Sequence, residues 1–88
     1  MLKIVRFGAV WCPACLIMGP IWKKLKEEFS FEEEYFDYDM DTDMVSVYKI
    51  GKILPEVILY KDGKEVERFV GEHTYSDLYK ALEGYVKK

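Results

Sequence analysis

The stretch Trp11-Cys12-Pro13-Ala14-Cys15 decides how this chain should fold, because it holds both cysteines of the 88 residues, separated by two positions. It lies between an apolar run and an amphipathic run, where a strand is expected to pass into a helix. Two cysteines at this spacing can close into a small disulfide ring and reopen by thiol exchange, whereas a scaffold disulfide more typically joins distant parts of a chain. The surrounding residues therefore decide whether the pair is a redox centre.

The residues on either side predict the strand and the helix. Residues 2–9 (LKIVRFGA) are apolar enough for a strand inside a sheet. Pro13 suits the first position of a helix, because the N–H that proline lacks would have no intrahelical partner there. Pro20 interrupts the same helix and should kink it. Apolar residues at every fourth position predict the buried face of this helix: Ile17, Ile21, Leu25 and Phe29.

Further elements follow along the chain. Asp62-Gly63 is a strong signal for a two-residue turn between β-rich runs and predicts a hairpin. Thr74, with Asp77 three residues later, resembles a capping box that opens a final helix. The acidic run Glu32–Glu34 is expected to be a solvated turn. The predicted segments are strands over 34–39, 57–60 and 65–70, a short helix over 42–50, and a final helix that buries Leu78, Leu82 and Tyr85 or Val86.

The resulting order, β-α-β-α-β-β-α, predicts an α/β fold with a single domain over residues 1–88. In this fold, helices cover both faces of a four-stranded mixed sheet. The first two strands are parallel because a helix joins them, and the hairpin adds an antiparallel pair. Half of the residues are hydrophobic, which suffices for a core without disulfide staples.

Charge and composition argue against several classes of function. The net charge is −3 and the 13 Lys and Arg residues form no basic stripe, which disfavours nucleic-acid binding. No stretch approaches the ~20 apolar residues of a membrane span, and no N-terminal segment has the pattern of a secretory signal. We therefore expect a cytoplasmic monomer, a setting in which a Cys-x-x-Cys pair is more often catalytic or metal-binding than structural.

A strand, Trp-Cys-x-x-Cys and an amphipathic helix in this order resemble the thioredoxin family. A second match is Ile53-Leu54-Pro55, just before the strand at 57–60, where members of the family carry a cis-proline beside the cysteines. Residues 61–64 (KDGK) resemble the family's hairpin turn. The resemblance covers nearly the whole chain and implies a minimal thioredoxin fold, like that of glutaredoxins, since the N-terminal strand and helix of full-length thioredoxins have no counterpart.

The resemblance implies a thiol–disulfide oxidoreductase that needs no cofactor. Thiol exchange requires one thiolate that attacks and a second thiol that resolves the mixed disulfide. Cys12 is the candidate nucleophile, because an exposed position at a helix N-terminus faces unpaired N–H groups that enrich the thiolate. Cys15, one turn inside the helix, should be more buried and act as the resolving thiol.

Four residues around the pair are candidates for substrate binding. A cis bond at Pro55 would present the backbone of Leu54 beside the cysteines, where an extended substrate could pair with it. Trp11 offers an aromatic contact platform, and Pro13 lies between the two cysteines.

Three positions depart from the pattern of thioredoxins. The residues between the cysteines are Pro13-Ala14 instead of Gly-Pro, and proline in first place is similar to glutaredoxins. Glu56 follows the proline where thioredoxins usually carry threonine. Arg6 takes the place of a buried aspartate. As a hypothesis, Arg6 favours the thiolate, stabilises the reduced form and makes the protein a stronger oxidant; alternatively it pairs with Glu56 or points to solvent.

The sequence leaves several functions open. The first is reduction of disulfides in protein substrates, with electrons from a flavoprotein reductase, and the second is a glutathione-linked glutaredoxin reaction. A third is a non-catalytic dimer that holds zinc or an iron–sulfur cluster through Cys12 and Cys15 of two chains. A fourth is a binding module in which the cysteines are incidental. His73, the lone histidine, is not needed for dithiol exchange.

Overall fold

Seven elements follow one another along residues 2–86, the part of the chain that this computed structural model describes. Their order is the predicted β-α-β-α-β-β-α. The elements are β1 (Leu2–Gly8), α1 (Pro13–Phe29), β2 (Glu32–Asp37), α2 (Thr42–Val47), β3 (Glu56–Lys61), β4 (Lys64–Val70) and α3 (Tyr75–Val86). No helix in this part of the chain is both long and apolar enough to span a bilayer.

The four strands form one mixed sheet in the order β2-β1-β3-β4. β1 runs parallel to β2 and antiparallel to β3, which pairs antiparallel with β4. In register, Arg6 of β1 lies opposite Tyr35 of β2 and Val57 of β3. Because β1 and β2 are parallel, their carboxyl ends meet at one edge of the sheet, and the cysteines follow the end of β1 there.

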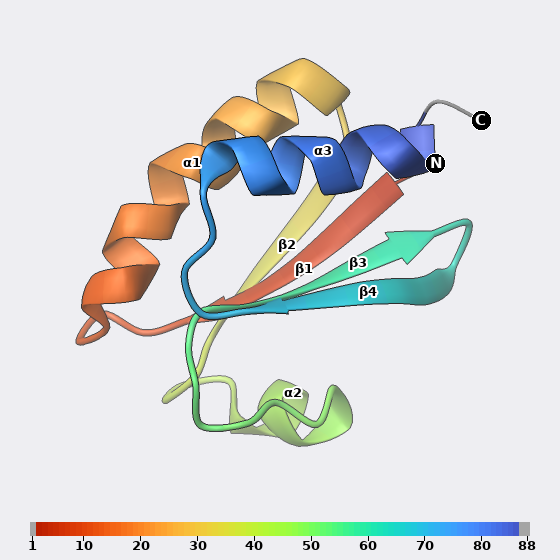
Figure 1. Ribbon diagram of the computed structural model, residues 1–88. Helices are drawn as coiled ribbons and strands as arrows, with labels where there is room; N and C mark the ends of the chain where they lie inside the picture. Colours follow the sequence, from red (N-terminus) through yellow and green to blue (C-terminus); the bar gives the residue numbers. More distant parts are fainter. Residues whose placement is uncertain (1, 87–88) are drawn as a thin grey trace.

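Helices cover both faces of the sheet, as the sequence predicts (Figure 1). α1 and α3 lie on one face, and the short α2 lies on the other. Alternate side chains of β1 enter two separate cores, with Ile4 in the core below α1 and α3 and with Val5 and Phe7 in the core near α2. The second core also contains Cys12, so the segment that joins β1 to α1 packs against the same face of the sheet as Val5 and Phe7.

The buried face of α1 differs from the predicted stripe. Ile17 is 55% exposed, whereas Met18, Trp22 and Leu25 are buried. A helix has 3.6 residues per turn, so a strict four-residue repeat drifts around the helix and leaves the core. The observed face steps by four, three and four residues to the half-buried Phe29, which keeps it pointed at the sheet.

The acidic run Glu32–Glu34 was wrongly predicted to be a turn, since it forms the first half of β2. It lies at the edge of the sheet, where charged side chains remain in water or find partners on the neighbouring strand. Glu34 pairs with Lys3 at 3.0 Å, and Glu33 pairs with Arg6. β2 therefore starts two residues before the predicted 34–39 strand, and α2 ends at Val47, before the predicted limit at residue 50.

The predicted hairpin and the cap of the last helix are confirmed. Asp62 and Gly63 have φ values of 52° and 83°, the two positive angles that a tight turn of this kind requires. Thr74 Oγ1 accepts a hydrogen bond from Asp77 N at 3.1 Å, and α3 begins at the next residue. Leu78 and Leu82 are buried on α3, as predicted.

Candidate active site

The cysteine pair lies where β1 passes into α1, at the edge of the sheet that also carries the loop into β3 (Figure 1). Pro13 is the first residue of α1, as predicted, and Cys12 caps the helix. The backbone N–H of Cys15 donates to Cys12 Sγ at 3.3 Å, and Cys12 N donates to Ala9 O at 3.2 Å. Both cysteines are free thiols in this structure. The fold thus presents a preformed pair with one sulfur at a helix N-terminus.

The burial of the two cysteines differs from the expectation. Cys12 is only 5% exposed, and Cys15 is half-buried. The reason lies elsewhere in the chain, because Ala9 and Leu54 pack with Cys12 in the second core. The residue named as the exposed nucleophile is therefore sheltered by the loop before β3, while Cys15 borders the sheet.

The electrostatics of the two thiols differ as well. Burial, and after it the hydrogen bond with Cys12, raises the pKa of the Cys15 thiol to about 11. Cys15 therefore carries its proton at neutral pH. Cys12 Sγ accepts a backbone N–H at the positive end of α1, whose first turn, residues 13–16, contains no acidic residue. The two sulfurs of the pair therefore differ both in burial and in hydrogen bonding.

The loop before β3 places its backbone beside the cysteines. The Leu54–Pro55 peptide bond is cis, as the resemblance implied. Pro55 O accepts a hydrogen bond from Gly71 N at 2.8 Å, which ties this loop to the end of β4. Among residues 2–86, the N–H and C=O of Leu54 have no hydrogen-bond partner. Leu54 is buried as a whole, but unpaired backbone groups of this kind can form hydrogen bonds with a strand supplied by another molecule.

Trp11 is 57% exposed beside the pair, and its indole is held by an aspartate that sequence reasoning missed. Trp11 Nε1 donates to Asp39 Oδ2 at 2.6 Å. Asp39 lies just after β2, in a turn where Asp37 Oδ1 accepts the N–H of Asp39 at 2.8 Å. The signal was available, since residues that follow two adjacent parallel strands meet at one edge of the sheet. It was obscured because the predicted strand ran on through residue 39.

Glu56 does not pair with Arg6. Its buried carboxylate accepts a hydrogen bond from Arg68 Nη1 at 2.9 Å and from Gly51 N at 3.2 Å. Hydrogen bonds to Glu65 and to Glu56 raise the pKa of Arg68, so the guanidinium stays charged. Gly51 belongs to the loop that carries Leu54, and Glu56 therefore anchors this loop to the sheet.

Arg6 is half-buried on the sheet face that α1 covers, and its partner is Glu33 of β2. Its guanidinium lies over the ring of Tyr35, with 5.1 Å from Cζ to the ring centroid. The charge of Arg6 lowers the pKa of Cys15 slightly against the larger effect of burial. Sequence reasoning missed both Glu33 and Tyr35, because the register between β1 and β2 cannot be read from either strand alone.

The lone histidine, His73, lies in the loop between β4 and α3. His73 Nε2 is 3.2 Å from Val70 O, and the imidazole packs against Phe69 near the start of α3. Across residues 2–86, no three His, Cys, Asp or Glu side chains gather in a group that could hold a metal ion.

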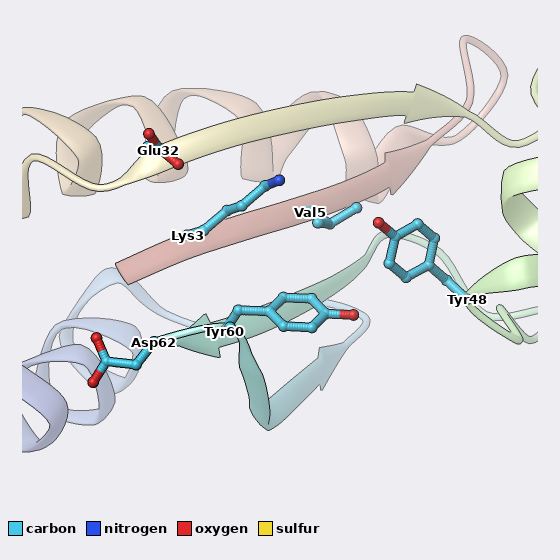
Figure 2. A pocket seen from close by; sticks show the side chains of 7 residues that line it. Lys3, Val5, Glu32, Tyr48, Tyr60 and Asp62 are labelled. Carbon is cyan, nitrogen blue, oxygen red and sulfur yellow. The ribbon is translucent and has the colours of Figure 1, made fainter. Parts of the chain in front are cut away.

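A cavity of about 460 Å³ lies at the other end of β1, on the face of the sheet that α2 shares. Figure 2 shows Tyr60 of β3 and Tyr48, which follows α2, near Val5 of β1, and the centroids of the two tyrosine rings are 6.5 Å apart. Lys3, in the wall of the cavity, is paired with Glu34. None of its lining residues is a cysteine, so the thiol chemistry belongs to Cys12 and Cys15, which follow the carboxyl end of β1.

Comparisons with known proteins identify the family of this chain. The family model described as Thioredoxin matches residues 1–84. Thioredoxin-2 of Saccharomyces cerevisiae is 37% identical over 71 residues, covering 80% of this chain and 67% of the relative. A thioredoxin of Coprinus comatus is 32% identical over 88 residues, covering 97% of this chain and 77% of the relative.

Solved structures give the same result. A mutant thioredoxin from Halobacterium salinarum superposes with a TM-score of 0.87 at 27% identity, covering 96% of this chain and 74% of that protein. Thioredoxin from Trypanosoma brucei brucei superposes with a TM-score of 0.86 at 26% identity, covering 100% of this chain and 77% of that one. The chain therefore belongs to the thioredoxin family, as a thioredoxin-type thiol–disulfide oxidoreductase whose active site is the pair Cys12 and Cys15.

Proposed function

We propose that the protein reduces disulfides of protein substrates in the cytoplasm and is itself reduced by a flavoprotein reductase. The observation that carries this proposal is the difference between the two thiols of the pair. Cys12 accepts a backbone N–H at the start of α1, whereas burial keeps Cys15 protonated. The cytoplasmic setting rests on cysteine usage, since both cysteines belong to the reactive pair and neither staples the fold.

In the first step, the Cys12 thiolate attacks one sulfur of the substrate disulfide. A bond forms between Cys12 Sγ and that sulfur, the substrate S–S bond breaks, and the second substrate sulfur leaves as a thiolate that takes up a proton. The backbone N–H of Cys15 donates to Cys12 Sγ at 3.3 Å and holds this sulfur at the start of α1 before the attack.

In the second step, Cys15 loses its proton and its sulfur attacks Cys12 Sγ. The Cys12–substrate bond breaks, the remaining substrate sulfur leaves and is protonated, and the protein keeps a Cys12–Cys15 disulfide. Two electrons have passed from the dithiol to the substrate. Because burial raises the pKa of Cys15 to about 11, this thiol keeps its proton at neutral pH until the second step.

We assign substrate contact to Trp11, Pro13, Leu54 and Pro55. The free N–H and C=O of Leu54 suit hydrogen bonds to an extended substrate segment. The exposed indole of Trp11 and the exposed ring of Pro13 supply apolar contact on the other side of the pair. Glu56 contributes indirectly by anchoring the loop that carries Leu54.

Insulin reduction tests the proposal, with the protein kept reduced either by NADPH and thioredoxin reductase or by glutathione and glutathione reductase. We expect turnover with the first system, none with Cys12→Ser, and a trapped insulin mixed disulfide with Cys15→Ser. Full activity of Cys12→Ser would overturn the assignment of the nucleophile. Turnover with glutathione alone would move the protein to the glutaredoxin reaction, and stoichiometric zinc or iron–sulfur cluster in the purified dimer would replace catalysis by metal binding.

A further inference from the structure

Gly8, the last residue of β1, lies where a sulfur and a phenol come together. A Cβ atom at this position would lie 2.8 Å from Tyr35 Oη and 3.3 Å from Cys15 Sγ. A side chain here would displace one of these groups, whereas glycine lets both approach the backbone. Both atoms lie close to this one Cβ position, so they are no more than about 6 Å apart, a distance that one bridging water can span.

Tyr35 is held in this place by its ring. It lies opposite Arg6 in the register of β1 and β2, and the guanidinium of Arg6 covers the ring at 5.1 Å. Arg6 is in turn held by Glu33, which also lies 3.8 Å from Lys26 of α1. About half of the Tyr35 surface is exposed, but its hydroxyl end points to Gly8. The phenol is thus fixed from above while its hydroxyl faces the cysteine edge.

The phenol of Tyr35 is protonated at neutral pH. Burial raises the pKa of Tyr35, and the neighbouring Cys15 and Asp37 raise it further. A neutral phenol is a hydrogen-bond donor to a developing thiolate. The group that needs such a donor is Cys15, because burial opposes its ionisation.

We propose that the Tyr35 hydroxyl donates a hydrogen bond to Cys15 Sγ as this thiol loses its proton in the resolving step, with Gly8 providing the space for the contact. The proposal rests on the proposed function and adds a residue to its second half. Tyr35 positions and stabilises the resolving sulfur and leaves the first attack by Cys12 unaffected.

The step balances without any further reagent. The thiol proton of Cys15 passes to water, its sulfur forms a bond with Cys12 Sγ, and the substrate sulfur leaves with the electron pair of the broken bond. That sulfur then takes a proton from water, so the step is neutral in protons. The hydroxyl of Tyr35 keeps its own proton throughout and acts only as a donor.

The two steps can be timed separately with one equivalent of dithiobis-nitrobenzoate. Attack by Cys12 releases the first coloured thiolate, and attack by Cys15 on the mixed disulfide releases the second. We expect Tyr35→Phe to leave the first release unchanged and to slow the second about tenfold between about pH 6 and pH 8, the effect of losing one hydrogen bond to a charged group. The substitution keeps the ring below Arg6, and Tyr60→Phe, at the far end of the sheet, is the matched control.

Two results separate this role from a structural one. The pH at which the second release reaches half its maximal rate should rise in Tyr35→Phe. The other charged or titratable groups near Tyr35 are the same in both proteins: Arg6, Glu33, Asp37, Lys26 and Cys12. A second release within twofold of the wild type, or an equal slowing of both releases, overturns the proposal. A wild-type protein that makes only the first release would instead overturn the proposed function.

Gly8→Ala gives an independent test, because it displaces the hydroxyl without removing it. We expect this variant to slow the second release in the same direction as Tyr35→Phe. In the double variant, Gly8→Ala should add nothing further, since the contact it disturbs is already gone. If Gly8→Ala slows the Tyr35→Phe protein as much as it slows the wild type, the glycine serves another purpose and the proposed contact is wrong.

Discussion

The two sides of the cysteine pair are built from different parts of the chain. The Cys12 side consists of loops, with exposed Trp11 and with backbone groups of Leu54 that have no hydrogen-bond partner among residues 2–86. The Cys15 side is the sheet itself, where Arg6 and Tyr35 form a polar group below α1. The first side suits recognition and the second suits control of a proton. Substitutions on the two sides should therefore affect different steps.

The two sides also differ in how they are held. The polar group of the Cys15 side is made by neighbouring strands in register, so the sheet fixes it directly. The loop on the Cys12 side depends on a buried carboxylate, Glu56, which joins Gly51 to Arg68 of β4. The loop on the Cys12 side should thus depend on this charge pair together with the hydrogen bond between Gly71 N and Pro55 O.

The largest expected effect is the loss of that pair. Arg68→Met leaves the buried charge of Glu56 without its cationic partner, and we expect it to lower the free energy of unfolding by about 3 kcal/mol. Glu65→Gln is the control, because it removes only the exposed partner of Arg68 and should cost less than about 1 kcal/mol. Urea unfolding measures both. Equal costs would mean that the buried pair does not anchor the loop.

A second and smaller effect concerns pH on the Cys15 side. Folding raises the pKa of Cys15 from 9.0 to about 11, so the folded state holds this proton more tightly than the unfolded chain. The reduced protein should have its full stability below about pH 9 and lose stability as the pH rises to about 11. We expect a loss of about 1 kcal/mol, reduced by solvent screening because Cys15 is only half-buried.

Cys15→Ser is the reference for this pH effect, since tyrosines and lysines titrate in the same range in both proteins. Over this interval the unfolding free energy of the wild type should fall by about 1 kcal/mol more than that of Cys15→Ser. Parallel curves for the two proteins would show that Cys15 ionises in the folded state as easily as in the unfolded chain.

A third effect separates the charges of the polar group. In a Cys12→Ser background, Arg6→Gln should slow alkylation of Cys15 two- to threefold, roughly the effect of one partly screened charge, because the cation lowers the pKa of this thiol. Glu33→Gln should speed alkylation by a similar factor, since it leaves the charge of Arg6 uncompensated. Iodoacetamide kinetics at alkaline pH measure both. Changes of the same sign would remove Arg6 as a tuning residue.

The order of elements was predictable because its signals are local. Asp62-Gly63 specifies its own turn, and Pro13 marks the start of α1 wherever the helix packs. The burial of Cys12 was not predictable, because it depends on Leu54, which lies far along the chain. The partner of Arg6 was not predictable for a similar reason, since it depends on the register of β1 against β2.

The same limit applies to the edge strand and to the glycine. The acidic residues at the start of β2 hide a strand whose partners lie on β1. Gly8 could have been noticed as a glycine at a strand end, a position that often allows a close approach. Its two neighbours, however, come from α1 and β2, so only the folded chain identifies them.

The smallest expected effect tests the recognition side. Asp39→Leu removes the acceptor for Trp11 Nε1 and lets the indole turn away. We expect a two- to threefold rise in KM for insulin with kcat unchanged, because one exposed hydrogen bond contributes about 0.5 kcal/mol. Asp39→Asn keeps an oxygen acceptor and should lie between Asp39→Leu and the wild type. The buried Trp22 gives a constant background, so acrylamide quenching reports on Trp11 alone. A fall in kcat without a change in KM would place Trp11 in the chemical step. The Cys12 side would then contribute to the reaction as well as to substrate binding.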